Sequence, residues 1–186
     1  MSESEKAYAL VIGGTGMLER VCHWLVEQGY FVFVINRNRE KFDTMKSRNP
    51  NPEQLLPLTV DYHEEEQLLQ KVSSAFEKYG VPDLVVSWIH SSAPHALPLI
   101  LNQFKSRNKT WKLLHVQGSS SFFVKENTPV PENCQYRRIY LGFVIEDNVS
   151  RWLTHDEIAN GVIKVIQNDY QETIVGTLKP WNKRPQ

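Results

Sequence analysis

The chain has little cysteine and no long hydrophobic run. Its 186 residues include only Cys22 and Cys134, whose separation fits no metal-binding or redox-active motif. No apolar stretch approaches the roughly 20 residues that span a membrane. We therefore expect a soluble, cytoplasmic protein in its reduced form, with no membrane as a partner.

An excess of charge of either sign is also missing. Lysine and arginine together number 21, as do aspartate and glutamate, so the formal net charge is zero. Such a chain has no overall positive field to attract nucleic acid. Its 41% hydrophobic and 23% charged residues are ordinary for a globular protein. We expect one domain over residues 1–186 and no nucleic-acid partner.

Strand-like and helix-like patterns alternate along the chain. Apolar runs predict strands at residues 7–12, 30–35, 56–60, 83–88, 112–117, 138–145 and 173–178. Helical patterns lie at residues 17–28, 37–47, 63–79 and 94–107. A last helix is expected to begin at Thr154, where a capping box with Glu157 is predicted.

This alternation predicts an α/β, Rossmann-like fold with a doubly wound parallel sheet of six or seven strands. Right-handed crossovers give the strand order 3-2-1-4-5-6, with any seventh strand at the edge. In such a sheet a ligand binds beyond the carboxyl ends of the strands, where the order reverses. Functional residues are therefore expected just after residues 12, 35, 60, 88 and 117.

The stretch VIGGTGMLERVCHWL, residues 11–25, combines a predicted strand, a glycine-rich turn and the start of an amphipathic helix. Gly13 can form the tight turn, and Gly16 can let the backbone approach a pyrophosphate at the helix N-terminus. The alternative is a strand–helix turn without a ligand. Glu19 stands where such a turn has its third glycine, which serves close helix–strand packing. We expect Glu19 to push the helix outward or to point its carboxylate along the surface.

The motif VIGGTGMLE resembles the opening of short-chain dehydrogenases/reductases, in the atypical branch with extended-like GxxGxxG spacing. The resemblance is best over residues 7–121 and looser over 138–178. It implies a nicotinamide dinucleotide held by residues that follow the strands. These are Gly13, Thr15, Gly16, Met17, Leu18, Asn36, Arg37, Asn38, Asp61, Tyr62, Ser87, Trp88 and Ser119.

The residues after the second strand, Asn36-Arg37-Asn38, indicate which dinucleotide is bound. An acidic residue there would accept the ribose 2′-hydroxyl of NAD, whereas a guanidinium pairs with the 2′-phosphate of NADP. The alternative is a solvated basic helix start, which the helix dipole disfavours. We therefore expect NADP, with Arg37 at the 2′-phosphate. Asp61 either contacts the adenine, as the resemblance implies, or caps the next helix.

The catalytic part of the family pattern is missing. The resemblance implies a serine after the fifth strand and a Tyr-x-x-x-Lys motif on the next helix. Gly118 is followed by serines, but Tyr136 has Tyr140 four residues later instead of lysine. Both tyrosines lead into a predicted strand, so we expect a truncated chain that lacks the YxxxK helix. The tyrosine mechanism is not expected.

Other polar residues at the carboxyl edge are candidates for chemistry. His90 follows the fourth strand and is the first candidate for a substitute acid or base, since a histidine ordinarily titrates near pH 6.5. Ser120 could orient a carbonyl or the nicotinamide amide. The alternatives are a loop histidine that only packs or hydrogen-bonds, and a polar serine loop that lines the cofactor. No third ligand with usable spacing joins His90 and His95, so no metal site is expected.

Three classes of function remain. The first is an atypical NADP-dependent oxidoreductase acting on a small carbonyl compound or enone. The second is a non-catalytic NADP-binding module with a redox-sensing or regulatory role. The third is a Rossmann-like interaction domain without nucleotide, against which Gly13, Gly16 and Arg37 argue. The partner is accordingly a small-molecule substrate or none.

The segment 119–135 carries apolar residues but no helical period, and it follows directly on the fifth strand. Phe122, Phe123, Val124 and Val130 are available to cover the sheet there. We expect either a loop packed onto the sheet in a monomer or a homodimer through this surface, and favour the homodimer.

Overall fold

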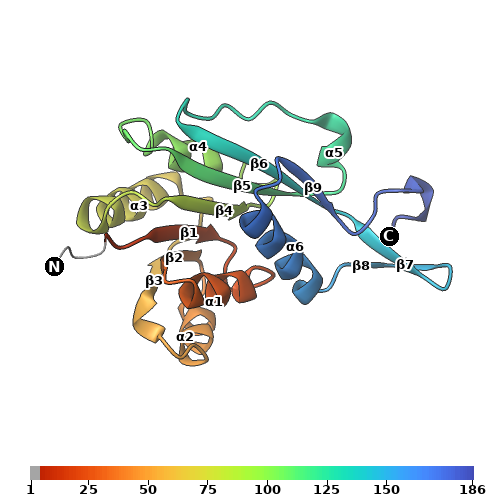
Figure 1. The fold of residues 1–186 in the computed structure, drawn as a ribbon. Coiled ribbons are helices and arrows are strands. Elements are labelled where there is room, and N and C mark those ends of the chain that lie inside the picture. Colours follow the sequence, from red (N-terminus) through yellow and green to blue (C-terminus); the bar gives the residue numbers. More distant parts are fainter. Residues whose placement is uncertain (1–4) are drawn as a thin grey trace.

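The computed structural model describes residues 5–186 and centres on a seven-stranded parallel sheet (Figure 1). The sheet order is β3-β2-β1-β4-β5-β6-β9, which confirms the predicted order with the seventh strand at the edge. Residues 1–4 of the predicted domain lie outside the described residues. The strands are β1 (Tyr8–Ile12), β2 (Phe31–Asn36), β3 (Leu55–Thr59), β4 (Leu84–Trp88), β5 (Trp111–Gly118), β6 (Cys134–Leu141) and β9 (Glu172–Val175).

Helices cover both faces of the sheet, as a doubly wound fold requires (Figure 1). Side chains alternate along each strand, so Val11 and Val34 pack toward one helical layer while Ile12 and Phe33 pack toward the other. The first layer contains α1 (Glu19–Glu27), α2 (Arg39–Ser47) and α6 (His155–Asn168). The second contains α3 (Glu65–Tyr79) and α4 (Ala96–Asn102).

All four helices predicted between strands begin two residues later than predicted, at Glu19, Arg39, Glu65 and Ala96, and the fourth also ends well before residue 107. The helix expected from residue 17 begins at Glu19, because the glycine turn runs on through Leu18. The helix expected over 94–107 is α4, which ends at Asn102 and passes into turns in which Gln103 N–H donates to the carbonyl of Ile100. The capping box predicted at the last helix is present, since Thr154 Oγ1 accepts from Glu157 N–H at 3.2 Å.

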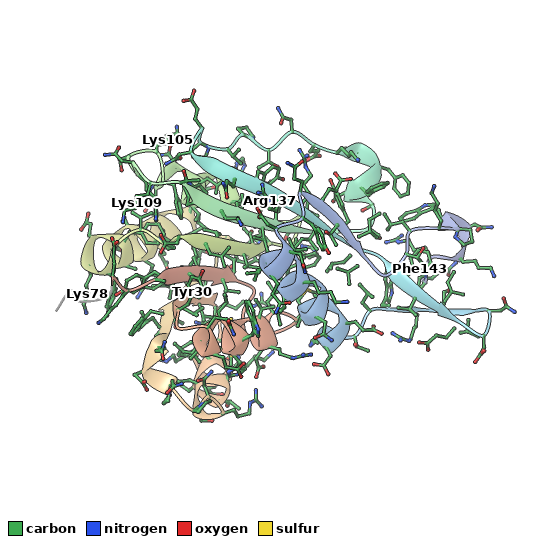
Figure 2. All side chains as sticks on the ribbon, viewed as in Figure 1. Tyr30, Lys78, Lys105, Lys109, Arg137 and Phe143 are labelled. Carbon is green, nitrogen blue, oxygen red and sulfur yellow. The ribbon has the colours of Figure 1, made fainter. Side chains whose placement is uncertain are left out.

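The strand expected over 138–145 is wrong in its extent. It divides at Gly142 into β6 and β7 (Phe143–Glu146), and β7 pairs antiparallel with β8 (Val149–Trp152) in a separate hairpin. A Cβ on Gly142 would overlap the carbonyl oxygen of Thr177, so only glycine fits at this division. Phe143, labelled in Figure 2, is fully buried at the base of the hairpin.

The hairpin turn consists of two residues with positive φ, Asp147 at 48° and Asn148 at 63°. Such turns match the natural twist of paired strands. This Asp-Asn pair is the local sequence signal that distinguishes a hairpin from one long strand.

The connection from β5 to β6 holds one short helix, α5 (Ser121–Val124), where no helix was expected. Phe122 packs edge-to-face on Tyr140 of β6, with ring centroids 5.3 Å apart, and so covers the sheet. Phe123 and Val124 remain 56% and 66% exposed. Among residues 5–186, no helix has the length and apolar character needed to cross a membrane.

Candidate dinucleotide-binding site

The turn after β1 depends on Gly13. Its φ of +86° is a backbone conformation that residues with a side chain rarely adopt. A Cβ here would also lie 3.1 Å from the carbonyl oxygen of Trp88, at the end of the neighbouring strand β4. The structure therefore contains the tight turn predicted at Gly13, at the point where the strand order reverses.

Gly14 and Gly16 have different surroundings. A Cβ on Gly16 would meet no atom within 4 Å, so the space beside this residue is open to a ligand. A Cβ on Gly14 would lie 2.8 Å from Val34 Cγ1 and 2.9 Å from Cys22 Sγ. Gly14 therefore supplies the close helix–strand packing that the sequence analysis assigned to the position of Glu19. The second glycine of the pair Gly13-Gly14 is the feature of the sequence that could have indicated this close packing.

Glu19 is the first residue of α1, and its side chain reaches the end of α2. Its carboxylate forms an ion pair with Arg48 and lies 3.5 Å from His23 Nε2. The side chain is thus directed along the surface, one of the two outcomes expected for it. A carboxylate in the first turn also stabilises α1 through the helix dipole.

Three further turn residues were predicted to hold the cofactor. The Leu18 side chain is fully buried in the core below α1, and Met17 packs against the same cluster. The Leu18 side chain is therefore unavailable to a ligand, and a phosphate contact here would use backbone N–H groups at the helix start. Thr15 is partly exposed, so its hydroxyl is accessible.

The residues Asn36-Arg37-Asn38 at the end of β2 have different roles: the two asparagines stabilise the local fold, and the arginine is exposed. Asn36 is buried and donates from its amide to the carbonyl of Val34 at 3.1 Å. Asn38 is the N-cap of α2 and accepts from Lys41 N–H at 3.0 Å. Arg37 is exposed, and its guanidinium pairs with no side chain in residues 5–186, whereas Arg39 pairs with Asp43 at 2.9 Å. Arg37 is thus the cation of this run that is available to an anionic ligand.

Asp61, after β3, stabilises a turn rather than a helix. Its Oδ1 accepts from His63 N–H at 3.0 Å, and α3 begins only at Glu65, so the helix-cap alternative is wrong. Hydrogen bonds from the backbone and ring of His63 hold the pKa of Asp61 below its usual value, and the charge of Arg37 adds to this effect. Tyr62 is partly buried, and its hydroxyl accepts from His90 N–H at 3.3 Å.

The end of β4 contains a buried polar group without a partner. Ser87 is fully buried, and within the described chain its hydroxyl makes no hydrogen bond. It stands opposite Ile12 in the register of β1 and β4, directly below the glycine turn. Trp88 follows it and packs against Gly13. A buried hydroxyl without a hydrogen-bond partner lowers the stability of the fold, so the end of β4 has a polar group that is not satisfied by the described chain.

The two residues proposed for chemistry lie on different loops. His90 contacts Tyr62 through its backbone and Ser92 through Nδ1 at 2.9 Å, so the structure brings it together with the loop after β3. Ser119 is buried at the end of β5, and Ser120 is exposed at the start of α5. Their roles in a reaction stay a prediction.

Tyr136 and Tyr140 lie on β6, as predicted. Tyr136 OH lies 2.7 Å from Nδ1 of His115, a contact that the sequence analysis missed. Burial, with a further effect of Arg138, lowers the pKa of His115 to about 4, so the imidazole is neutral near pH 7. Tyr140 is buried, and burial raises the pKa of its phenol. Tyr140 stands four residues after Tyr136, where the family pattern has its lysine, and the nearby cation is Arg138, whose guanidinium lies over the Tyr136 ring at 4.8 Å.

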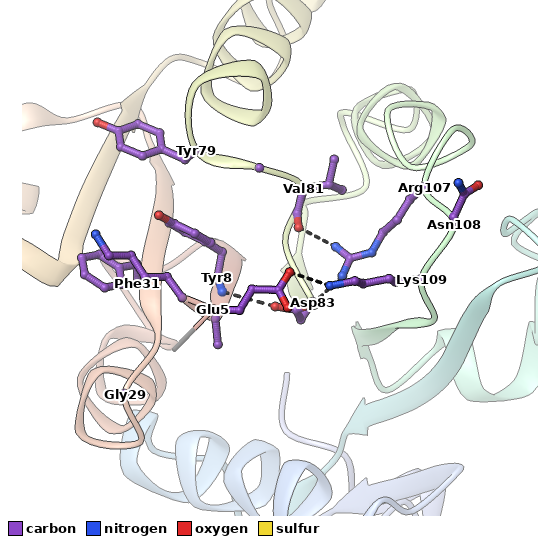
Figure 3. A pocket seen from close by; sticks show the side chains of 13 residues that line it. Glu5, Tyr8, Gly29, Phe31, Tyr79, Val81, Asp83, Arg107, Asn108 and Lys109 are labelled. Atoms are coloured by element: carbon purple, nitrogen blue, oxygen red, sulfur yellow. Dashed lines mark hydrogen bonds and ion pairs between the residues drawn. The ribbon is translucent and has the colours of Figure 1, made fainter. Parts of the chain in front are cut away.

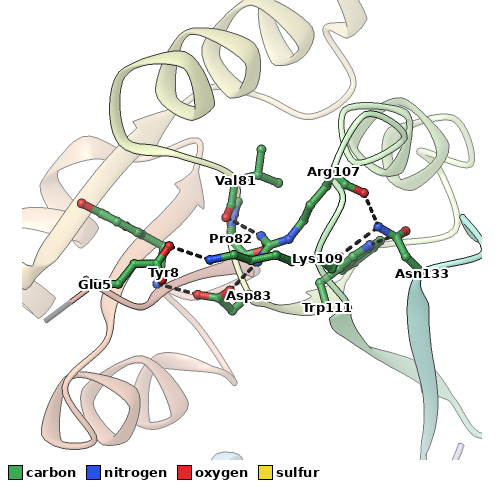
Figure 4. A network of polar contacts seen from close by, with 9 residues as sticks. All are labelled: Glu5, Tyr8, Val81, Pro82, Asp83, Arg107, Lys109, Trp111 and Asn133. Carbon is green, nitrogen blue, oxygen red and sulfur yellow. Dashed lines mark hydrogen bonds and ion pairs between the residues drawn. The ribbon is translucent and has the colours of Figure 1, made fainter.

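A cavity of about 1150 Å³ lies at the opposite, amino edge of the sheet (Figure 3). Arg107, which lines this cavity, donates to the carbonyls of Val81 and Pro82 and pairs with Asp83 (Figure 4). Lys109 and Glu5, which also line the cavity, form an ion pair with an Nζ–Oε1 distance of 2.6 Å. These contacts fix the loops before β4 and β5, and none involves a residue of the candidate site. No group of three or more His, Cys, Asp or Glu side chains in residues 5–186 could hold a metal ion.

Comparisons with known proteins locate this fold among solved structures. No protein-family model and no curated protein matches the sequence. The F189W actinorhodin polyketide ketoreductase with NADPH is similar over 96% of this chain and 98% of its own, at 14% identity and a TM-score of 0.69. An alcohol dehydrogenase from Thermococcus sibiricus complexed with 5-hydroxy-NADP matches over 98% and 100%, at 15% identity and a TM-score of 0.65.

A short-chain glucose/ribitol dehydrogenase from Brucella melitensis is similar over 91% of this chain and 94% of its own, at 12% identity and a TM-score of 0.68. At these identities the likeness concerns the fold. The chain has the fold of short-chain dehydrogenase/reductase structures.

Proposed function

We propose that this chain binds NADP at the carboxyl edge of its sheet and acts as an atypical oxidoreductase on a small carbonyl compound or enone. The observation that carries the proposal is Arg37, an exposed guanidinium with no paired side chain in the described chain, directly after β2. In a Rossmann-like sheet this position faces the ribose of the adenosine. NADPH- and 5-hydroxy-NADP-bound structures of the same fold support the same cofactor.

The residues that the structure describes at this edge of the sheet fit a bound NADP. The open space beside Gly16 accommodates a pyrophosphate at the start of α1, and Gly13 provides the turn that brings the backbone there. Arg37 would pair with the 2′-phosphate, and Asp61 would accept a hydrogen bond from the adenine amino group. Bound NADPH supplies a hydride to an electrophilic carbon.

The protein's own part in such a reaction is to orient the substrate and supply a proton. Ser120, exposed beyond β5, would hydrogen-bond the substrate carbonyl or the nicotinamide amide. His90 would donate the proton from Nε2, because its Nδ1 is held by Ser92.

A non-catalytic NADP-binding module is the second candidate. One support is that Tyr136 and Tyr140 lie on a strand without a neighbouring lysine. A second is that His90 contacts Tyr62, one of the residues predicted to hold the cofactor. Both candidates require tight NADPH binding, and they differ in turnover. Oxidation of NADPH by small carbonyl compounds and enones, followed by absorbance, distinguishes them; activity lost on Ser120→Ala and His90→Gln supports the oxidoreductase.

A further inference from the structure

The hydroxyl of Ser92 lies between two imidazole rings. Ser92 Oγ is 2.9 Å from Nε2 of His63 and 2.9 Å from Nδ1 of His90. On the far side of His63, its Nδ1 lies 2.7 Å from Oδ1 of Asp61. An aspartate, a histidine and a serine are thus linked in series across the loops that follow β3 and β4.

The hydrogen bonds determine which ring nitrogens carry protons. A carboxylate can only accept, so His63 Nδ1 carries the proton that it shares with Asp61. In the neutral ring, His63 Nε2 is then a lone-pair acceptor facing Ser92 Oγ. His90 Nδ1 accepts the backbone N–H of Ser92 at 3.1 Å, so it is a second acceptor. The serine proton therefore has an acceptor on either side.

This arrangement has the elements of an activated nucleophile. A carboxylate that orients a histidine, and a histidine that accepts a serine proton, define the role of each residue in nucleophilic catalysis irrespective of fold. Asp61 is suited to its part, because hydrogen bonds from His63 lower its pKa and keep it anionic near pH 7. We propose that Ser92 is a nucleophile with His63 as its base and Asp61 as the orienting residue, and that the chain transfers acyl groups from small activated esters to water.

The proposed reaction proceeds in two steps. Ser92 Oγ attacks the ester carbonyl carbon while its proton passes to His63 Nε2; the bond to the leaving phenol then breaks, and the phenol takes this proton. Water next attacks the acyl-serine and gives its proton to His63, which passes that proton to the serine oxygen as the acyl–oxygen bond breaks. The net change is ester plus water to carboxylic acid plus phenol, with no other reactant.

The exposure of the group defines the substrate class. The side chains of Asp61 and His63 are 42% and 39% exposed, so water reaches both the base and the acyl-serine. Solvent access weakens the electrostatic stabilisation that an enclosed site would offer. We therefore expect reaction with aryl acetates, whose leaving groups are good, rather than with alkyl esters or amides.

The test uses p-nitrophenyl acetate and the full chain. Release of p-nitrophenolate and peptide mass spectrometry should show acetylation of Ser92. Ser92→Ala should remove the acetylated peptide and the enzymatic release, whereas Ser91→Ala should change neither, because the neighbouring Ser91 makes no side-chain hydrogen bond in residues 5–186. His63→Gln and Asp61→Asn should slow acylation, the first by about 100-fold.

A fluorophosphonate probe covers the case in which the acyl-serine hydrolyses too quickly to isolate, since the phosphonylated serine is stable. Labelling of wild type that is unchanged in Ser92→Ala would overturn the proposal, as would no labelling at all. Ester hydrolysis that survives Ser92→Ala but is lost in His63→Gln would identify His63 as the nucleophile and overturn it equally. NADPH affinity, measured on Ser92→Ala, should equal that of wild type, because Ser92 is not among the residues proposed to hold the cofactor; failure of this proposal is thus distinguishable from failure of cofactor binding.

Discussion

Gly14 lies so close to Val34 that a Cβ on the glycine would be 2.8 Å from Val34 Cγ1. This approach fixes how near α1 packs to the strands β1 and β2. Because Gly14 performs this function, Glu19 is free to pair with Arg48 at the surface. Glu19, which stands where such turns have a third glycine, therefore leaves the space beside Gly16 open.

The glycines of the turn should separate stability from binding. Gly14→Ala should lower the free energy of unfolding by about 1–3 kcal/mol, because the added methyl overpacks a buried contact. Gly16→Ala should leave stability nearly unchanged and weaken NADPH binding, since its Cβ would enter open space that the proposed pyrophosphate would occupy. Urea denaturation and NADPH titration on both variants check this. Equal destabilisation by the two variants would contradict the assignment.

The partly buried His115 should make stability depend on pH. Its folded pKa of about 4 lies below the usual value, so the unfolded chain binds more protons between about pH 6.5 and 4. Stability from this residue is therefore present above pH 6.5 and declines as pH falls to about 4, by up to about 3 kcal/mol. His115→Gln should flatten this part of the profile, whereas the exposed His155→Gln should not. A His115 ring signal that titrates near pH 6.5 in NMR would show the prediction to be wrong.

The tyrosines of β6 should be dispensable for turnover. Tyr136 bonds a neutral His115, and Tyr140 is buried under Phe122, so neither phenol is prepared to transfer a proton. In any turnover assay, Tyr136→Phe and Tyr140→Phe should retain most of the wild-type activity. Loss of activity in a variant with wild-type circular dichroism would reassign the proton donor to β6.

Self-association through α5 is the fourth prediction. Phe123 and Val124 are 56% and 66% exposed, although Phe122 beside them covers the sheet. We expect sedimentation equilibrium to give a dimer of the 21.6 kDa chain, and Phe123→Asp to give the monomer. A mass near 21.6 kDa at every concentration would exclude the dimer.

Much of the fold could be predicted because buried parallel strands are continuous apolar runs, and the helices between them show a clear period. The division of β6 from β7 could not be seen in the same way, since RRIYLGFVI is apolar throughout and the limit depends on the approach of Thr177 to Gly142. A contact from another part of the chain determines that boundary.

The candidate site was predicted unevenly for a similar reason. The turn at Gly13 and the exposed place of Arg37 after β2 could be predicted, because they follow from backbone conformation and from position after a strand. Asn36 and Asn38 were placed with the cofactor, but their side chains stabilise the end of β2 and the start of α2. The contact of His63 with Ser92 joins residues 29 apart in sequence, on loops that only the sheet order brings together, and no local pattern indicates it.

Comparison of NADPH and NADH binding, in wild type and in Arg37→Asp, tests the central claim most directly. Nicotinamide fluorescence should show tighter binding of NADPH to wild type. Arg37→Asp should abolish this preference by removing a charge-assisted contact of about 1.5–3 kcal/mol, or about 10- to 160-fold in affinity. Arg39→Asp, which makes the same charge change at a residue already paired with Asp43, should retain the preference. Equal affinity of the unaltered protein for both nucleotides, or binding of neither, would contradict the account.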